Sequence, residues 1–350
     1  MADGTTFASQ PRSATSYEVT IGGTTYKQTE DLGVQSIILE DHMDMVDMIT
    51  VKLGGAEGQP KWSFKIGDSI EAKIGSGSNL MFKGHITSIE PSFQAEGIAS
   101  IVVRGLDPVH ILGRGRKTRF WEDVKDSDVV SEVGQECGLS VDADATEQVQ
   151  PYIIQRNETN VAFCKRLAAR NNFMLRVEES SLLFKKNQYQ GASSSIELGK
   201  NLRSLRMACN SVDQVSQVIV RGWDIMTKQE VVGVASSGDV TSIGGGELGM
   251  KAASSAFGDS IAYITDVPVS SQEQATAIAK AELERLARQF VRGTASIQGD
   301  DQLRAGVLVE FKGLSSPYDG KYYVMASRHI VSNRTGYTTE FTFCSNTFGS

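Results

Sequence analysis

The segments FKIGDSIE (residues 64–71) and FKGHI (residues 82–86) return in pattern near the other end of the chain, as LRAGVLVE (residues 303–310) and YDGKYYV (residues 318–324). In each copy a glycine, Gly67 or Gly306, stands four residues before a glutamate. A second glycine, Gly84 or Gly320, follows the first by 17 or 14 residues. Glycine tolerates the backbone angles of tight turns, and apolar alternation predicts a strand with one buried face. We therefore predict that these four glycines are the turns of a structural repeat.

Further strands complete each copy. GIASIVVRG (residues 97–105) follows the first copy, and GYTTEFTFC (residues 336–344) follows the second. A turn, an alternating strand, a second turn and two more strands make a small antiparallel unit. We predict an α+β fold, mainly β, with two similar small antiparallel β-barrels per chain and pseudo-twofold symmetry between them.

Composition is typical of a soluble globular protein, with 350 residues, 40% hydrophobic and 22% charged. No apolar run approaches the roughly 18 residues of a membrane helix, so we predict no membrane insertion. The N-terminal sequence lacks the basic and apolar regions of a secretory signal, which predicts cytoplasmic synthesis. The four cysteines are scattered and are predicted to be free thiols. The net charge of −7 argues against a dedicated nucleic-acid-binding protein.

The hydrophobic pattern changes along the chain and divides it. An α+β insert begins after Gly113, with helices near Asp126 and Thr159, and the longest helix is predicted between Ser270 and Gly293. The predicted division is a flexible arm (1–16), a first tube-like β-barrel (17–113), the α+β insert domain (114–205), a second tube-like β-barrel (206–232 and 294–346), an insertion with a loop and a long helix (233–293), and a tail (347–350).

Residues that could carry chemistry do not form a recognisable site. Asp41, His42, Asp44 and Asp47 are the densest group of possible metal ligands, but a solvated acidic turn explains them better than a metal site. The chain has no GxSxG elbow and no HExxH motif. His85 and His329 are expected on a sheet face. We predict no catalytic residues, no metal and no cofactor.

A basic segment, GRGRKTR (residues 113–119), has two interpretations. Its cations could contact phosphate or an acidic neighbour. It lacks the spacing of a phosphate-binding loop, however, and a solvated interdomain linker is the stronger interpretation.

Several segments recur together in one order: YIIQRNET (152–159), FCKRLA (163–168), VIVRGWD (218–224), LRAG (303–306), YDGKYYV (318–324), Arg328-His329 and GYTTEF (336–341). In this set the chain resembles the late control D family of phage tail hub proteins. That family also forms the N-terminal part of type VI secretion spike proteins and occurs in contractile injection systems. The resemblance covers roughly residues 17 to 346.

The resemblance implies a structural role. It implies a homotrimer whose three chains give six similar barrels, so that a threefold hub matches a sixfold tail tube. The implied partners are the tail tube protein, a separate spike protein and other baseplate proteins, with DNA or protein cargo passing through an acidic lumen. The spike is expected to be separate because the sequence ends at Ser350, just after the second barrel. The protein would end up in an assembled virion tail or injection particle.

Two other functions were weighed against this one. A tail-associated cell-wall hydrolase and a carbohydrate-binding module are both compatible with a β-rich chain. Neither needs a duplicated β unit joined to an α+β insert, so the structural hub is the preferred hypothesis.

Overall fold

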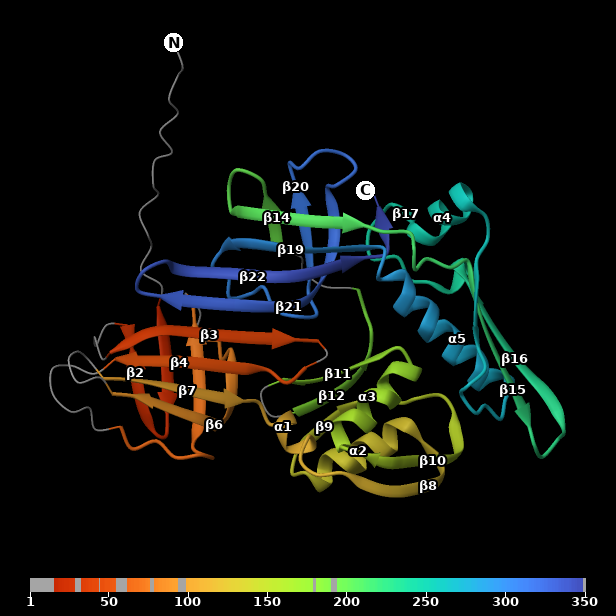
Figure 1. Ribbon diagram of the computed structural model, residues 1–350, viewed down its shortest axis with the longest axis horizontal. Coiled ribbons are helices and arrows are strands. Elements are labelled where there is room, and N and C mark those ends of the chain that lie inside the picture. Colours follow the sequence, from red (N-terminus) through yellow and green to blue (C-terminus); the bar gives the residue numbers. More distant parts are fainter. Residues whose placement is uncertain are drawn as a thin grey trace, which may run out of the picture.

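A computed structural model describes residues 16–28, 33–43, 45–54, 62–75, 79–93, 99–178, 181–189 and 194–348. Figure 1 shows a long curled sheet that runs from the first part of the chain to its last part, with two smaller units packed beside it. The predicted arm at residues 1–16 lies, apart from Ser16, outside the described residues.

The first half of the sheet comes from the N-terminal part of the chain. Its strands are β1 (Tyr17–Ile21), β2 (Thr24–Lys27), β3 (Val34–His42), β4 (Met48–Gly54), β5 (Ser69–Ile74), β6 (Phe82–Ser92) and β7 (Ser100–Leu106). Buried and less buried residues alternate along them, as in Tyr17–Ile21 and Val34–His42. The apolar side chains of the buried face form one core, and each buried Val, Leu or Ile contributes about 1.5–3 kcal/mol.

The second half comes from residues far apart in the sequence. Its strands are β13 (Ser194–Glu197), β14 (Leu202–Cys209), β19 (Val291–Gln298), β20 (Leu308–Lys312), β21 (Gly320–Ser332) and β22 (Gly336–Ser345). They enclose a second, aromatic core that includes Phe311, Tyr322, Phe341 and Phe343.

The two halves have the same strand order. The first half runs β1-β5-β6-β7-β4-β3, and the second runs β13-β20-β21-β22-β19-β14. Both contain a bulge in the long strand, between Ile86 and Ser88 in β6 and between Val324 and Ala326 in β21. A second matching irregularity lies near the start of β3 and of β14. The halves differ in that β1 pairs antiparallel with β5, whereas β13 pairs parallel with β20. Bulges re-aim a strand, so their shared positions give both halves the same bend.

The halves are joined into one sheet. Strand β21 pairs with β3 over Ala326–Ser332 and Ser36–His42, in the middle of Figure 1. Hydrogen bonding therefore makes one continuous curled sheet of 13 strands, where the sequence predicted two barrels. The mainly β, α+β class is as predicted.

The insert lies below the sheet in Figure 1 and has its own core. It contains α1 (Val109–Leu112), β8 (Lys117–Lys125), α2 (Asp126–Glu136), β9 (Ser140–Ala143), β10 (Val149–Glu158), α3 (Asn160–Arg170), β11 (Phe173–Glu178) and β12 (Ser181–Lys186). Thr159 caps α3, because its hydroxyl accepts a hydrogen bond from the Ala162 N–H. Strand β13 and the start of β14 belong to the large sheet, although residues 194–205 were assigned to the insert.

A third unit corrects another predicted assignment. Strands β15 (Gln217–Asp224) and β16 (Gln229–Ser236) were placed in the second barrel with residues 206–232, but they form a separate sheet with β18 (Ile261–Ile264). Their apolar face packs on α5 (Gln272–Ala287) instead of on the large sheet. Helix α5 begins after Ser271 and ends before Arg288, so Gly293, the predicted stop, lies inside β19.

The remaining elements lie in the predicted insertion and tail. They are the 3-10 turn Ser237–Asp239, β17 (Glu247–Leu248), α4 (Gly249–Phe257) and β23 (Thr347–Phe348). The insertion at residues 233–293 was predicted to hold a loop and one long helix, but nine further residues form α4. Strand β17 pairs with β23 and so ties the insertion to the C-terminal segment.

Candidate functional site

Gly67 and Gly306 lie in matching turns of the two halves. Their φ angles are +93° and +89°, in the region that favours glycine. The Gly67 N–H donates to the Ile86 carbonyl, and the Gly306 N–H donates to the Val324 carbonyl, both at 2.9 Å. In return the Ile86 N–H donates to the Asp68 carbonyl, and the Val324 N–H donates to the Val307 carbonyl. Each glycine thus attaches its turn to the bulged strand at the same place.

The second predicted pair of glycines is not equivalent. Gly84 lies inside β6, paired with Ile70, and is not in a turn. A Cβ at Gly84 would lie 2.2 Å from the Leu106 carbonyl oxygen, so this glycine permits close packing of strands. Gly320 is the first residue of β21 and is paired with Phe311, at the position that Phe82 occupies in β6.

The junction between β21 and β3 shows how one half covers the other. On its buried face Val331 lies opposite Ile37, and His329 lies opposite Leu39. Ile37 and Leu39 are 0% exposed and Val331 is 6% exposed. Val331 belongs to the second half but packs into the core of the first.

Within the described residues, the positions equivalent to this junction have no partner strand on β6 of the first half or on β14 of the second half. Strand β5 covers only Phe82–His85 of β6, and among the described strands none pairs with that side of Ser88–Ser92. Strand β14, which pairs only with β19 in the described part of the chain, is also an open edge. Phe93, the counterpart of Val331, is 73% exposed, and Leu205 and Met207, the counterparts of Ile37 and Leu39, are only partly buried. A row of unpaired backbone groups beside exposed apolar side chains is typical of a pairing edge.

A buried polar cluster lies where the two halves and the insert meet. Arg304 donates to the Asp41 carboxylate at 2.6 Å, and Arg176 of the insert donates to the Ala305 carbonyl. The Asp47 N–H donates to Asp107 at 3.0 Å. Asp41 and Asp47 were expected in a solvated turn, but both are buried, and Asp41, 1% exposed, serves as a structural ion-pair partner. Asp44 lies outside the described residues.

Burial and charge shift the acids of this cluster in opposite directions. Burial alone would raise the pKa of Asp41, but the guanidinium groups of Arg304 and Arg176 hold it below its usual range. Burial, together with the nearby Asp41 carboxylate, raises the pKa of Asp47 to about 8. Burial raises the pKa of Asp107 to about 6. Asp47 is therefore the acid of this cluster that keeps its proton at neutral pH.

Asp41, Ser327 and His329 lie together but do not form a catalytic triad. The Ser327 hydroxyl lies between the other two, 3.5 Å from Asp41 and 3.1 Å from the His329 Nε2 atom. In a triad the histidine takes the middle place. All three side chains are buried, and burial lowers the pKa of His329 to about 4. Among the described residues, no group of three or more His, Cys, Asp or Glu side chains is arranged to hold a metal.

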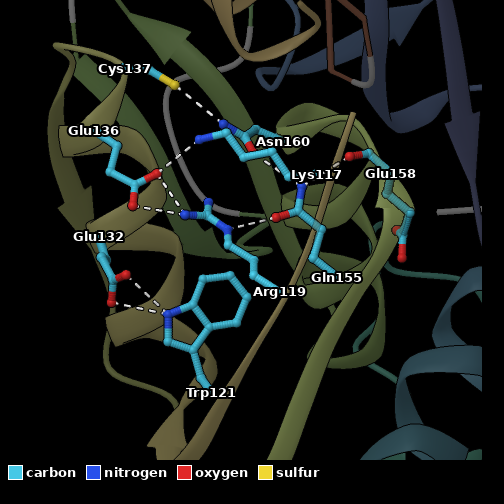
Figure 2. A network of polar contacts seen from close by, with 9 residues as sticks. All are labelled: Lys117, Arg119, Trp121, Glu132, Glu136, Cys137, Gln155, Glu158 and Asn160. Atoms are coloured by element: carbon cyan, nitrogen blue, oxygen red, sulfur yellow. Dashed lines mark hydrogen bonds and ion pairs between the residues drawn. The ribbon is translucent and has the colours of Figure 1, made fainter. Parts of the chain in front are cut away.

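The basic segment at residues 113–119 belongs partly to a polar network in the insert (Figure 2). Arg119, on β8, donates to both oxygens of Glu136 at 2.7 Å and to Gln155 at 2.9 Å. Gln155 is fully buried and also bonds to the Glu158 carbonyl and the Asn160 side chain. Arg119 is therefore committed to internal contacts that hold β8, β10 and α2 together, and does not belong to a free linker.

Sequence reasoning missed the open edges. The signal was present in IEPSF (residues 89–93), where every second residue is apolar, but it did not show which partner strand was missing. That information came only from the equivalent positions on β21.

Comparisons with known proteins place the fold. A family model described as Alg8 N-terminal domain matches residues 13–333. The 43 kDa tail protein of prophage MuSo2 from Shewanella oneidensis has a TM-score of 0.72 at 15% identity, over 94% of this chain and 98% of that one. A tail protein from Neisseria meningitidis MC58 also has a TM-score of 0.72, at 13% identity, over 95% and 97%.

A third solved structure is a component of a secretion system. The E. coli c3393 protein belongs to the type VI secretion system, and its structural similarity to the T4 bacteriophage tail proteins gp27 and gp5 is noted. Its TM-score is 0.64 at 10% identity, over 95% of this chain and 78% of that one. No curated protein matches the sequence. In the described part of the chain, no helix has the length and hydrophobicity needed to span a membrane. At these identities the likenesses establish the fold.

Proposed function

Because the chain belongs to the Alg8 N-terminal domain family and has the fold of phage tail proteins, we propose that it is a structural hub of a phage tail or contractile injection system. The matching family model is not the late control D family named from the sequence. The role in a tail is supported by the solved structures of similar fold, which are tail and secretion-system proteins.

The hub is proposed to be a ring of three chains. The observation that carries this proposal is the exposure of Phe93 at the position where Val331 is buried. In the ring, the outer side of β6 in one chain pairs with the β14 edge of the next, as β21 pairs with β3 inside each chain. Each half of the sheet acts as one tube-like unit, so three chains supply six similar units around an axis.

The internal junction predicts the register of the contact between chains. Transferred through the shared strand order, it sets Ile89 opposite Cys209, Pro91 opposite Met207 and Phe93 opposite Leu205. These three pairs are apolar. In the junction inside the chain, the position equivalent to Ile89 and Cys209 is instead the polar pair of Ser327 and Asp41. Pro91 has no N–H to donate, so the ladder is expected to be short.

Charge supports the same register. On the outer face, Glu90 comes opposite Ala208 and diagonal to Arg206 of the neighbouring chain. Inside the chain, Arg328 lies 3.4 Å from Glu40 on the corresponding face. Diagonal side chains on neighbouring strands are within reach when they are long. The contact between chains would therefore have an apolar inner face and an ion pair outside.

A ring of six similar units explains why the sheet is duplicated. A sixfold tail tube and a threefold spike cannot share equivalent contacts unless one partner carries an internal repeat. The proposed partners are the tube protein on one side, the spike on the other, and baseplate proteins around them. DNA or protein cargo would pass through the lumen of the assembled particle. We propose a structural and not a catalytic role, supported by the committed, buried state of the Asp41, Ser327 and His329 side chains.

The proposal is tested by mass and by cross-linking. A ring of three chains has a mass of about 114 kDa, three times the chain's 37.9 kDa. Cys209 is exposed and free, so Ile89→Cys should create an inter-chain disulfide under mild oxidation. Non-reducing gels should then show covalent dimers and trimers, with no larger products because the ring closes.

Ser88→Cys is the matched control, because its side chain points to the other face of β6. It should cross-link much less than Ile89→Cys. Equal cross-linking by both variants, an open ladder beyond the trimer, or a monomer at high concentration would overturn the ring. Clearance of peptidoglycan by the isolated chain would favour the hydrolase instead.

A further inference from the structure

A large groove lies on the outer face of the second half of the sheet. Its volume is about 1130 Å³, above the range of roughly 300–1,000 Å³ that is usual for small-molecule pockets. Its floor is formed by β14, β19, β22 and β21, one wall by α5, and the other by α3 and the start of β11. Figure 1 shows α5 descending from the end of this sheet toward α3.

The groove is basic although the chain is acidic. Seven Lys and Arg side chains line it with one acid, Glu282, while the chain as a whole carries −7. Arg166, Arg170 and Arg285 have carboxylate partners. Within the described part of the chain, Arg288 and Arg292 have no ion pair. Arg206 lies at the rim, where the proposed ring already assigns it a partner.

Between its charges the groove is apolar and adaptable. Four of the ten methionines line it, among them Met174 and Met325, together with Phe173 and Ile278. Methionine side chains are flexible and polarisable, so they can adjust to different apolar surfaces. Thr294 and Thr342 are exposed on its floor. Apolar side chains on the walls and floor distinguish this groove from a surface that binds only phosphates.

We propose that the groove binds an acidic amphipathic α-helix of a partner protein. Its apolar stripe would lie on the floor, and its carboxylates would pair with Arg288 and Arg292. A helix fits because its backbone groups are bonded internally, whereas the floor is a sheet face whose one free edge, β14, is paired with β6 of the next chain in the proposed ring. Two arginines without ion pairs among the described residues, beside the apolar side chains of the groove, are the complement of such a helix.

This site shares strand β14 with the proposed ring, because Arg206, Met207 and Ala208 line the groove and also lie at the predicted ring contact. The groove positions chosen for the test, Arg288, Arg292 and Thr294, lie on β19 and just after α5, outside that contact. Groove variants should therefore leave the assembled mass unchanged, and Phe93 variants should leave binding to the groove unchanged. Failure of one proposal is distinguishable from failure of the other.

The test uses a labelled model peptide and the full chain. A fluorescent helix of about 18 residues, with leucines at helical spacing and glutamates opposite, is titrated by fluorescence anisotropy. Arg288→Gln with Arg292→Gln should weaken binding about tenfold, because the glutamates of the peptide lose both arginines that pair with them. Arg114→Gln with Lys52→Gln, at exposed positions outside the groove, removes the same charge and should not change it. Thr294→Trp should block binding by filling the floor without changing any charge.

Two further probes give outcomes that would overturn the proposal. A peptide with serine in place of leucine should lose binding. If it bound as tightly as the leucine peptide, the groove would be a site for polyanions and not for an amphipathic helix. A single-stranded oligonucleotide that competes as well as the acidic helix would point to nucleic acid. Unchanged affinity in both the double glutamine variant and Thr294→Trp, with thermal unfolding like that of the wild type, would place the helix elsewhere.

Discussion

Phe93 and Val331 occupy the same position in two copies of one strand, yet Val331 is 6% exposed and Phe93 is 73% exposed. Each follows the bulge of its strand by the same number of residues. Val331 is covered because β3 pairs with β21 inside the chain. Phe93 is uncovered because its side of β6 has no partner among the described strands. One sequence thus contains both a completed junction and its open counterpart.

Phe93→Ser should dissociate the proposed ring without unfolding the chain. Phe93 buries little surface within one chain, so the free energy of unfolding of the monomer should change by less than about 1 kcal/mol. Size-exclusion chromatography with light scattering should show a shift from the trimer mass to the monomer mass. A trimer that persists in this variant would contradict the predicted contact.

Val331→Ala is the matched comparison at the equivalent position. It removes buried methyl groups from the core of the first half, so it should destabilise the chain by about 1–2 kcal/mol. Urea denaturation measures this loss, while light scattering should show that assembly is retained. Phe93→Ser should therefore change the assembled mass but not the stability of the chain, whereas Val331→Ala should change the stability but not the assembled mass.

The two turn glycines should differ in their tolerance of a side chain. Gly67→Ala meets no atom within 4 Å, so only the left-handed backbone opposes it, at a cost of about 1–2 kcal/mol. At Gly306 a Cβ would lie 3.0 Å from an Arg176 nitrogen and 3.1 Å from the Met43 sulfur. Gly306→Ala should therefore lower the urea midpoint more than Gly67→Ala. Equal urea midpoints for the two variants would mean that the Arg176 and Met43 side chains move away from the added Cβ at little cost in free energy.

The β-rich class and most strands could be predicted from alternation, because the inner face of each strand is apolar. The repeat around Gly67 and Gly306 could also be predicted, since a turn that requires a positive φ favours glycine at that position. The equivalence of Gly84 and Gly320 was wrong, because a glycine that permits close strand approach looks the same as one in a turn. Strand spacing alone cannot separate the two.

The destination of β15 and β16 could not be predicted for a different reason. Their alternating pattern shows that one face is buried, but not against which element. The partner is α5, some 50 residues later in the chain. The prediction for the acidic residues was wrong for a similar reason. Asp41 was expected to be solvated because its ion-pair partner, Arg304, is 263 residues away in the sequence.

The network in Figure 2 predicts a contrast between a buried and an exposed member. Gln155→Ala would remove one hydrogen-bond partner each from Arg119, the Glu158 carbonyl and the Asn160 side chain at a buried site, so it should cost about 3 kcal/mol. Lys117→Ala removes an exposed ion pair with Glu136 and should cost less than about 1 kcal/mol. Denaturation curves of the two variants test this order, and the reverse order would show that the network depends on its surface charges.

The acids between the halves predict how stability depends on pH. The pKa of Asp47 is raised to about 8 by burial, whereas in the unfolded chain it lies near 4. Between these values the folded state keeps a proton that the unfolded state loses. Raising the pH from about 4 to about 8 should therefore lower the contribution of Asp47 to the free energy of unfolding, and Asp107, with a pKa of about 6, adds to the fall below pH 6. Burial lowers the pKa of His329 to about 4, so this histidine opposes the fall below its unfolded pKa of about 6.5.

Asp47→Asn isolates this effect. Its side-chain oxygen can still accept from the His42 N–H, but it no longer titrates. The difference in urea midpoint between the variant and the wild type should grow in favour of the variant as pH rises from 5 to about 8. Other acids titrate in both proteins and cancel in the difference. A difference that stays constant with pH would mean that Asp47 is already ionised in the folded state, with Arg304 holding both its charge and that of Asp41.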